Sequence, residues 1–391
     1  MLNTKNMVVC NFCQSIDLES VYQVIESPRE AEVKVCKHCG LVQSIFVKPK
    51  LSQRIASVSS GADWGNVRHG KGLRLKAAIP LISSVIPLDR LNSVLDIGSN
   101  RGNFILWLNE LYPNLNITGV EPDSTIINDY KNTSNFILYQ DTLENVTFST
   151  QYFDFIYCSH TLEHAESASI MLKKIHKLLV TGGYLFLEVP NLDVLCLTDT
   201  VEEFFIDKHR FHFQRDILIE YLRYLGFNII LGKDDYDSFN ITIVAVKSEG
   251  SDQTKIFDYQ SDIERIKTII NNYQIYLEKN RQLLQEVAEI INKFMLRQKV
   301  VFWGGGKIFD ALIKYGKLNT DKLLGVVDEY LYKVFPIYGK ILIQNPSQIK
   351  MLQPDVVIVL ARSSSNEIIE KVRKLGVKNV IKFQDILQSL T

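Results

Sequence analysis

Short apolar runs and amphipathic stretches alternate along the middle of the chain. Each run is long enough for one buried strand and ends at a polar or glycine-containing turn, and helical patterns follow at 103–111 and 168–179. Buried runs that alternate with helices predict a parallel sheet whose strands are joined by crossover helices. The expected strands are Ser93–Ile97, Asn116–Val120, Phe136–Gln140, Phe153–Cys158 and Leu185–Asn191.

A second, smaller α/β region is predicted near the C-terminus. Apolar positions recur with helical spacing over 259–297 without glycine or proline, which predicts one long helix or two helices joined near Asn280. A strand then runs into Gly304-Gly305-Gly306, which is either a nucleotide-binding turn or a structural one. The remaining expected elements are a helix to Tyr315, strands at Leu323–Val327 and Asp355–Leu360, and a helix at Glu367–Leu375.

Length and charge limit the organisation and the partners. A chain of 391 residues exceeds one ordinary core, and the pattern divides it into regions 1–74, 75–250 and 251–391. Basic residues number 44 and acidic residues 44, so neither nucleic acid nor an anionic membrane is an expected partner. No apolar run spans a bilayer and no leader pattern opens the chain, so a cytoplasmic monomer or homodimer is expected.

Four cysteines near the N-terminus have metal-binding spacing. Cys10 and Cys13 form one C-x-x-C corner, Cys36 and Cys39 form another, and 22 residues separate the corners. Two such corners supply four thiolates to one tetrahedral Zn²⁺ with no open position, which predicts a structural zinc knuckle. Paired disulfides and a redox pair are the alternatives. His38 is not an expected ligand, because its corner needs only the two cysteines.

Chemistry-bearing residues gather where the predicted strands end. Asp96 and Gly98 close the first run, and Glu121 follows the second run 25 residues after Asp96. Open α/β sheets bind ligands at the carboxyl ends of their strands, and an acid at the second tip is where a ribose diol is held. The third and fourth runs bring further residues to this edge, in the segment Asp141-Thr142-Leu143 and in the histidine-rich turn Ser159-His160-Thr161-Leu162-Glu163-His164.

The glycine spacing distinguishes between nucleotides. A dinucleotide site uses G-x-G-x-x-G, whereas this loop reads D-I-G-S-N-R-G-N. Together with the Leu-x-x-Gly-Gly-x-Leu pattern at 179–185, the loop resembles the class I S-adenosylmethionine (SAM) methyltransferases. A phosphate or NAD site with a degenerate loop is the alternative.

The methyltransferase resemblance implies a role for each strand tip. The glycine loop passes under the methionine part of SAM, Glu121 takes the ribose hydroxyls, and Asp141 reaches the adenine amino group while an apolar neighbour packs on the ring. The implied SAM-binding residues are Asp96, Gly98, Ser99, Gly102, Glu121, Pro122, Asp141, Thr142, Leu143, Ser159 and His160.

Two segments outside the strand tips are candidates for acceptor binding. Aromatic residues surround His209 and His212 in the stretch 203–213, which predicts a base in a partly apolar pocket or, alternatively, two histidines that only pack the loop. The Gly- and Ser-rich stretch 57–74 carries Trp64, Arg68, His69 and Lys71, and is either a substrate-closing loop or a linker.

The order of the parts is similar to one family, the three-domain sugar C-methyltransferases. These have an N-terminal zinc-binding domain, a class I SAM domain and a Rossmann-like C-terminal domain, and they methylate nucleotide-linked 4-keto-deoxysugars at C-3. The resemblance implies that His209 is the base that forms the enolate. We expect Lys208 to stabilise the enolate oxygen.

Two further classes of function remain as alternatives. The first is an O- or N-methyltransferase acting on a sugar or glycan precursor, in which His209 or His160 removes the proton from the acceptor. The second is a non-catalytic module with the SAM fold. SAM binding separates the second alternative from the two enzymatic ones.

Overall fold

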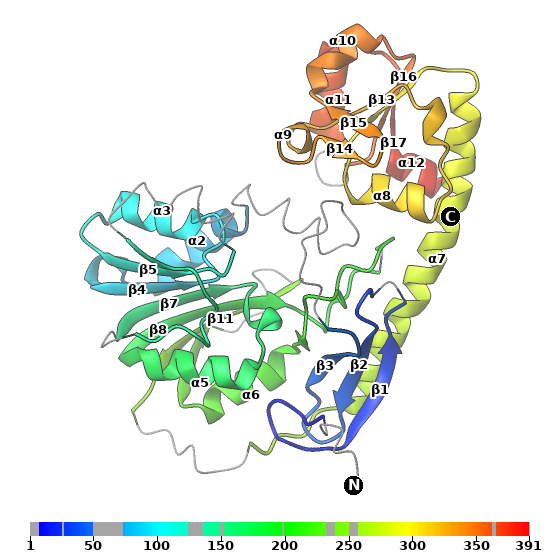
Figure 1. Cartoon of the computed structure of the whole chain (residues 1–391). Helices are drawn as coiled ribbons and strands as arrows, with labels where there is room; N and C mark the ends of the chain where they lie inside the picture. Colours follow the sequence, from blue (N-terminus) through cyan, green and yellow to red (C-terminus); the bar gives the residue numbers. More distant parts are fainter. Residues whose placement is uncertain are drawn as a thin grey trace. The chain divides into compact units, whose positions relative to one another are not determined.

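The computed structural model describes residues 8–25, 27–49, 73–123, 136–148, 152–197, 199–231, 239–249, 257–361 and 365–390 (Figure 1). The segment with Trp64, Arg68, His69 and Lys71 lies outside the described residues. The described residues divide into two compact units. The first takes those up to Cys196 together with Asp207–Asn271, and the second takes Leu197–Ile206 and those from Asn272 onward. The division into regions 1–74, 75–250 and 251–391 stays a prediction.

The first unit is built on a seven-stranded sheet of order β10-β11-β8-β7-β4-β5-β6. The five expected strands pair in parallel, and β11 is antiparallel to both β8 and β10. This confirms the Rossmann-like α/β sheet that the sequence predicts. The strands are β4 (Ser93–Ile97), β5 (Asn116–Val120), β6 (Ile137–Tyr139), β7 (Phe153–Ser159), β8 (Leu179–Pro190), β10 (Phe227–Leu231) and β11 (Asn240–Lys247).

Helices cover both faces of this sheet, as Figure 1 shows. Successive strand residues point to opposite faces, so Val94 packs into one apolar cluster and Leu95 into the other. Because both faces are buried, β4 reads as an apolar run rather than an alternating one. The helices on the Val94 side are α2 (Leu73–Val85) and α3 (Asn103–Leu111), and those on the Leu95 side are α5 (Ala168–Leu178) and α6 (Arg215–Tyr224).

The start of the predicted strand Leu185–Asn191 differs most from the structure. The helix expected to run to Leu179 ends at Leu178, and β8 begins at Leu179 rather than after the glycine pair. Gly182 has φ +81° inside this strand, which is a left-handed conformation that glycine adopts without strain. The glycine pair therefore bends the start of the strand instead of preceding it.

The cysteine segment forms a small antiparallel sheet within the first unit. Its order is β1-β2-β3-β9, and β9 (Phe211–His212) comes from the segment that leads into α6. The Phe12 ring stacks on Tyr221 of α6 with centroids 3.7 Å apart. The three N-terminal strands are β1 (Leu18–Gln23), β2 (Ala31–Cys36) and β3 (Val42–Phe46). The sequence pattern did not predict them.

The second unit has a six-stranded sheet of order β14-β15-β13-β12-β16-β17. The predicted parallel core is present, and β14 adds an antiparallel edge strand. Side chains alternate here too, so Phe302 and Trp303 enter different apolar clusters. The strands are β12 (Val300–Trp303), β13 (Gly325–Val327), β14 (Ile337–Tyr338), β15 (Ile341–Gln344), β16 (Val356–Val359) and β17 (Val380–Lys382).

The predicted long helix is a single element, α7 (Ile263–Met295), whose residues from Asn272 onward belong to the second unit. Among the described helices, none combines the length and the apolar character needed to cross a bilayer. The other helices of the second unit are α8 (Lys307–Lys314), α9 (Leu331–Val334), α10 (Ile349–Leu352), α11 (Ser365–Lys374) and α12 (Phe383–Gln388).

Candidate active site and metal centre

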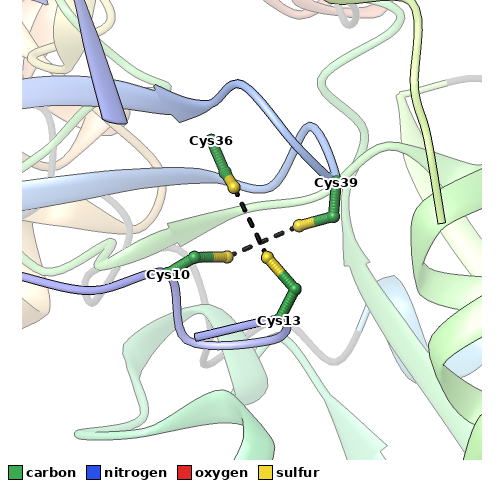
Figure 2. A group of neighbouring side chains, drawn as sticks. All are labelled: Cys10, Cys13, Cys36 and Cys39. Carbon is green, nitrogen blue, oxygen red and sulfur yellow. Dashed lines mark hydrogen bonds between the residues drawn. The ribbon is translucent and has the colours of Figure 1, made fainter. Parts of the chain in front are cut away.

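The four predicted cysteine ligands converge on one point, as Figure 2 shows. The Sγ atoms of Cys10 and Cys39 lie 3.4 Å apart, and those of Cys13 and Cys36 lie 3.5 Å apart. A disulfide requires about 2.05 Å between its sulfurs, so these cysteines are not paired as disulfides. Sulfurs around a tetrahedral Zn²⁺ lie about 3.8 Å apart, given Zn–S bonds of about 2.3 Å. The arrangement fits one metal ion.

The surroundings of these thiols also fit a cation. All four cysteines are buried, and neighbouring thiols raise the pKa of Cys10 and of Cys39. Four buried sulfurs this close cannot all ionise without a positive charge between them. His38 contacts Asp258 with its Nε2 atom 3.1 Å from Oδ1, and it is not part of the sulfur cluster.

The glycine loop turns tightly at the end of β4. Gly98 and Gly102 have φ of +73° and +71°, and a Cβ at Gly98 would lie 2.1 Å from Thr161 Oγ1. The Gly98 and Ser99 amides donate to the Val120 carbonyl at 2.8 and 3.1 Å. The loop is therefore held against the tip of β5 and the turn after β7, and residues with a side chain do not fit at Gly98.

Glu121 at the tip of β5 contacts this loop. The Asn100 amide donates to Glu121 Oε2 at 2.9 Å, and the Asp123 amide donates to Oε1 at 3.0 Å. Asp96 is buried beside it, and burial together with the Glu121 charge raises the pKa of Asp96 well above its usual value. Two acidic groups at one tip favour a cationic ligand there.

The third predicted tip lies beside the second. The Glu121 amide donates to the Tyr139 carbonyl at 3.0 Å, so β6 ends next to β5 and leads into Asp141. Asp141 is exposed and accepts from the Asn145 amide at 2.9 Å, which lowers the pKa of its carboxyl. Leu143 is buried, whereas Pro122 is exposed. The binding roles of these residues stay predictions.

The fourth tip places His160 between two buried carboxylates. Its Nδ1 lies 3.5 Å from Glu163 Oε1 and its Nε2 lies 3.4 Å from Glu188 Oε1. The Ser159 hydroxyl donates to Glu188 at 2.9 Å. Burial alone would lower the pKa of His160, but the two carboxylates outweigh it and raise that pKa. His160 has φ +49°, so it occupies the left-handed region where non-glycine residues are strained.

Glu163 links His160 to His164 and to the predicted base His209. Candidate ligand atoms of Glu163, His164 and His209 all lie within 4.8 Å of one another, and the rings of His164 and His209 are 4.9 Å apart. The Arg210 amide donates to the Glu163 carbonyl at 2.8 Å, which fixes the His209 segment to the turn after β7. Glu163 is 1% exposed. Three histidines therefore surround one buried carboxylate.

The other residues of the histidine stretch are placed differently. Lys208 has an exposed side chain, and its carbonyl accepts from His164 Nδ1 at 3.0 Å. His212 is buried on β9 with its Nε2 2.8 Å from the Ser44 hydroxyl. This contact matches the alternative in which His212 packs the loop. The role of Lys208 at an enolate oxygen stays a prediction.

The sequence indicates the turn Ser159–His164 as a candidate site, but it assigns no individual role to Glu163 or His164 and does not single out Glu188. Glu163 and His164 follow β7 closely, and Glu188 lies near the carboxyl end of β8, where open α/β sheets bind ligands. Of the remaining cysteines, Cys158 is fully buried in the sheet and Cys196 is half-buried.

Comparisons with known proteins agree with this description. The family described as "Methyltransferase domain" matches residues 69–231, and the family described as "C2185-like, N-terminal" matches residues 296–381. Residues 69–231 are thus similar to a methyltransferase domain. A curated relative, the tRNA U34 carboxymethyltransferase of Desulforapulum autotrophicum, is 31% identical over 113 residues, which cover 27% of this chain. The match spans 34% of that relative's length.

Solved structures show distant similarity to part of the chain. A SAM-dependent methyltransferase from Mesorhizobium loti is 13% identical with a TM-score of 0.37, and the match covers 44% of this chain and 98% of that one. Human N-acetylserotonin methyltransferase in complex with SAM is 15% identical with a TM-score of 0.37, and the match covers 48% of this chain and 57% of that one.

Proposed function

We propose that this protein transfers the methyl group of SAM to a carbon of a small acceptor, and that the acceptor is a nucleotide-activated keto-deoxysugar. One observation carries the proposal. Thr161 contacts the glycine loop at Gly98, and this threonine directly follows His160. A histidine and its carboxylates therefore adjoin the loop of a methyltransferase domain.

The strand tips hold the cofactor in this proposal. Bound SAM supplies a sulfonium methyl group that needs alignment rather than activation. The Glu121 carboxylate accepts hydrogen bonds from the ribose hydroxyls, because the two backbone amides that donate to it leave some of its lone pairs available. Asp141 and Leu143 lie beside the adenine in this proposal. The acidic pair of Asp96 and Glu121 favours the positive charge of the cofactor.

A histidine of the cluster removes the acceptor proton. A carbon next to a ketone is only weakly acidic, so its proton must be taken by a base while the oxygen charge is stabilised. His160 and His209 both border Glu163 and are the two candidates for this base. Lys208 follows Asp207 on the same segment and is the candidate partner of the oxygen.

The cysteine cluster has a structural role in this proposal. We assign Zn²⁺ to Cys10, Cys13, Cys36 and Cys39, because four thiolates close the coordination sphere and leave no position for a substrate. The ion would fix the Cys10–Cys13 turn from which Phe12 stacks on α6. It takes no part in the reaction.

Product analysis tests the acceptor. Incubation with methyl-labelled SAM and a panel of nucleotide-activated keto-, hydroxy- and aminosugars is expected to give one labelled product, a keto-deoxysugar methylated at carbon, identified by mass spectrometry and NMR. A product labelled only on oxygen or nitrogen would replace C-methylation with the corresponding alternative. Labelling of none of the sugars would contradict the acceptor class.

A further inference from the structure

We infer that Glu163, His164 and His209 bind a divalent transition-metal ion, separate from the ion of the four cysteines. The argument begins with Glu163. Its carboxylate is buried, and among the described residues no hydrogen bond reaches either oxygen. A buried charge without hydrogen bonds costs several kcal/mol, roughly, and native proteins compensate for it with a partner.

The histidine nitrogens nearest to Glu163 are too distant to satisfy it. His160 Nδ1 lies 3.5 Å from Oε1, and His164 Nε2 lies 3.7 Å from the same oxygen. Charge-assisted hydrogen bonds between nitrogen and oxygen are about 2.7–2.9 Å long. A cation that sits between the carboxylate and the imidazoles accounts for the wider spacing.

The orientation of His164 independently favours a metal. Its Nδ1 donates to the Lys208 carbonyl at 3.0 Å, so in the neutral ring Nε2 carries the lone pair. That lone pair is on the Glu163 side of the ring, where a carboxylate alone would repel it. An imidazole that donates its other N–H to a backbone carbonyl is the usual arrangement of a metal-binding histidine.

Binding one ion requires the ligand atoms of this cluster to move closer together. The three ligand atoms lie within 4.8 Å of one another. Ligand atoms around a tetrahedral ion at about 2.1 Å lie about 3.4 Å apart, so ligand atoms separated by up to 4.8 Å must approach one another by as much as about 1.4 Å. The His164 side chain is 37% exposed and has room to rotate, and it also leaves the ion a route from solvent.

The donor set indicates the kind of ion. Two imidazole nitrogens and one carboxylate suit Zn²⁺ and its first-row neighbours better than Mg²⁺ or Ca²⁺, which prefer oxygen ligands. Three protein ligands leave an open position, unlike the four thiolates. An ion there would act as a Lewis acid on the acceptor oxygen. With His209 bound to it, His160 would be the histidine that takes the proton.

Metal binding to the full chain tests the inference without SAM or an acceptor. Protein with its thiolate site already filled by zinc is titrated with Co²⁺ in a calorimeter, and one further ion per chain is expected to bind. Glu163→Gln and His164→Ala should each weaken this binding at least about tenfold, since loss of even an outer-shell partner costs 10- to 100-fold. His164 is near the surface, so its variant should fold if Glu163→Gln does not.

The matched control is Glu166→Gln. This variant removes an exposed carboxylate that lies three residues after Glu163 and pairs with Arg210, and it should bind Co²⁺ as the wild type does. Uptake of no ion beyond the thiolate-bound one would overturn the inference, as would equal affinity in wild type and His164→Ala. Because neither SAM nor an acceptor is present, either result leaves the proposed methyl transfer standing.

Discussion

Substituting Cys39 with serine is expected to release the thiolate-bound zinc and to destabilise the first unit by several kcal/mol, roughly. Structural zinc sites contribute about 10–16 kcal/mol of apparent binding energy in zinc-finger peptides. The expected destabilisation therefore requires the loss of only part of the energy of zinc binding. A loss of only about 3 kcal/mol lowers the unfolding temperature of a unit this size by roughly 6–12 °C. Thermal unfolding followed by circular dichroism measures this shift.

The effect should extend beyond the cysteine turns. Phe12 lies between Cys10 and Cys13 and stacks on Tyr221, and the Asn11 side chain accepts from the Ser169 amide at 2.8 Å. Release of the ion frees this turn and so exposes the face of α6. Cys196→Ser is the control, because this half-buried cysteine is not in the cluster. An unchanged unfolding temperature and unchanged thiolate-to-cobalt absorption in Cys39→Ser would contradict the zinc assignment.

Substituting His160 or His209 with asparagine is expected to lower turnover by about 10²- to 10⁴-fold, the usual contribution of a general acid or base. Affinity for SAM should stay unchanged in His209→Asn, because His209 lies outside the glycine loop and the strand tips. Turnover is measured with the acceptor that the product panel identifies, and affinity by calorimetry.

The two histidine variants should differ in metal binding. His209→Asn loses a ligand of the inferred ion, whereas His160→Asn keeps all three. His38→Asn is the control for turnover, because His38 lies at the cysteine turn against Asp258 and outside the cluster. Full activity in both His160→Asn and His209→Asn would remove the histidine base from the mechanism.

The central sheet was predictable because its strands are buried on both faces. Such strands are continuous apolar runs in the sequence, and the polar residues at their carboxyl ends follow directly. The sequence therefore predicts that Gly98, Glu121 and His160 lie at one edge of the sheet. The sequence did not predict that β11 is antiparallel to β8, because an apolar run gives no information on the direction of the strand in the sheet.

The contacts around Glu163 were not predictable from local pattern. His209 lies 46 positions after Glu163 in the sequence, and the hydrogen bond from the Arg210 amide to the Glu163 carbonyl helps to bring the two together in the fold. The strands of the cysteine segment were missed for a different reason. They have five or six residues each, and their stability depends on pairing with one another and with β9 rather than on their own pattern.

The central claim is that SAM binds across the tips of β4 and β5, and calorimetric titration of the full chain with SAM tests it most directly. One SAM should bind per chain, and Glu121→Ala should weaken binding by about 1.5–3 kcal/mol, roughly 10- to 150-fold, the value of hydrogen bonds to a charged group. Glu110→Ala, on the exposed surface of α3, should bind as the wild type does. Absence of SAM binding to the wild type would contradict the claim, and so would wild-type affinity in Glu121→Ala.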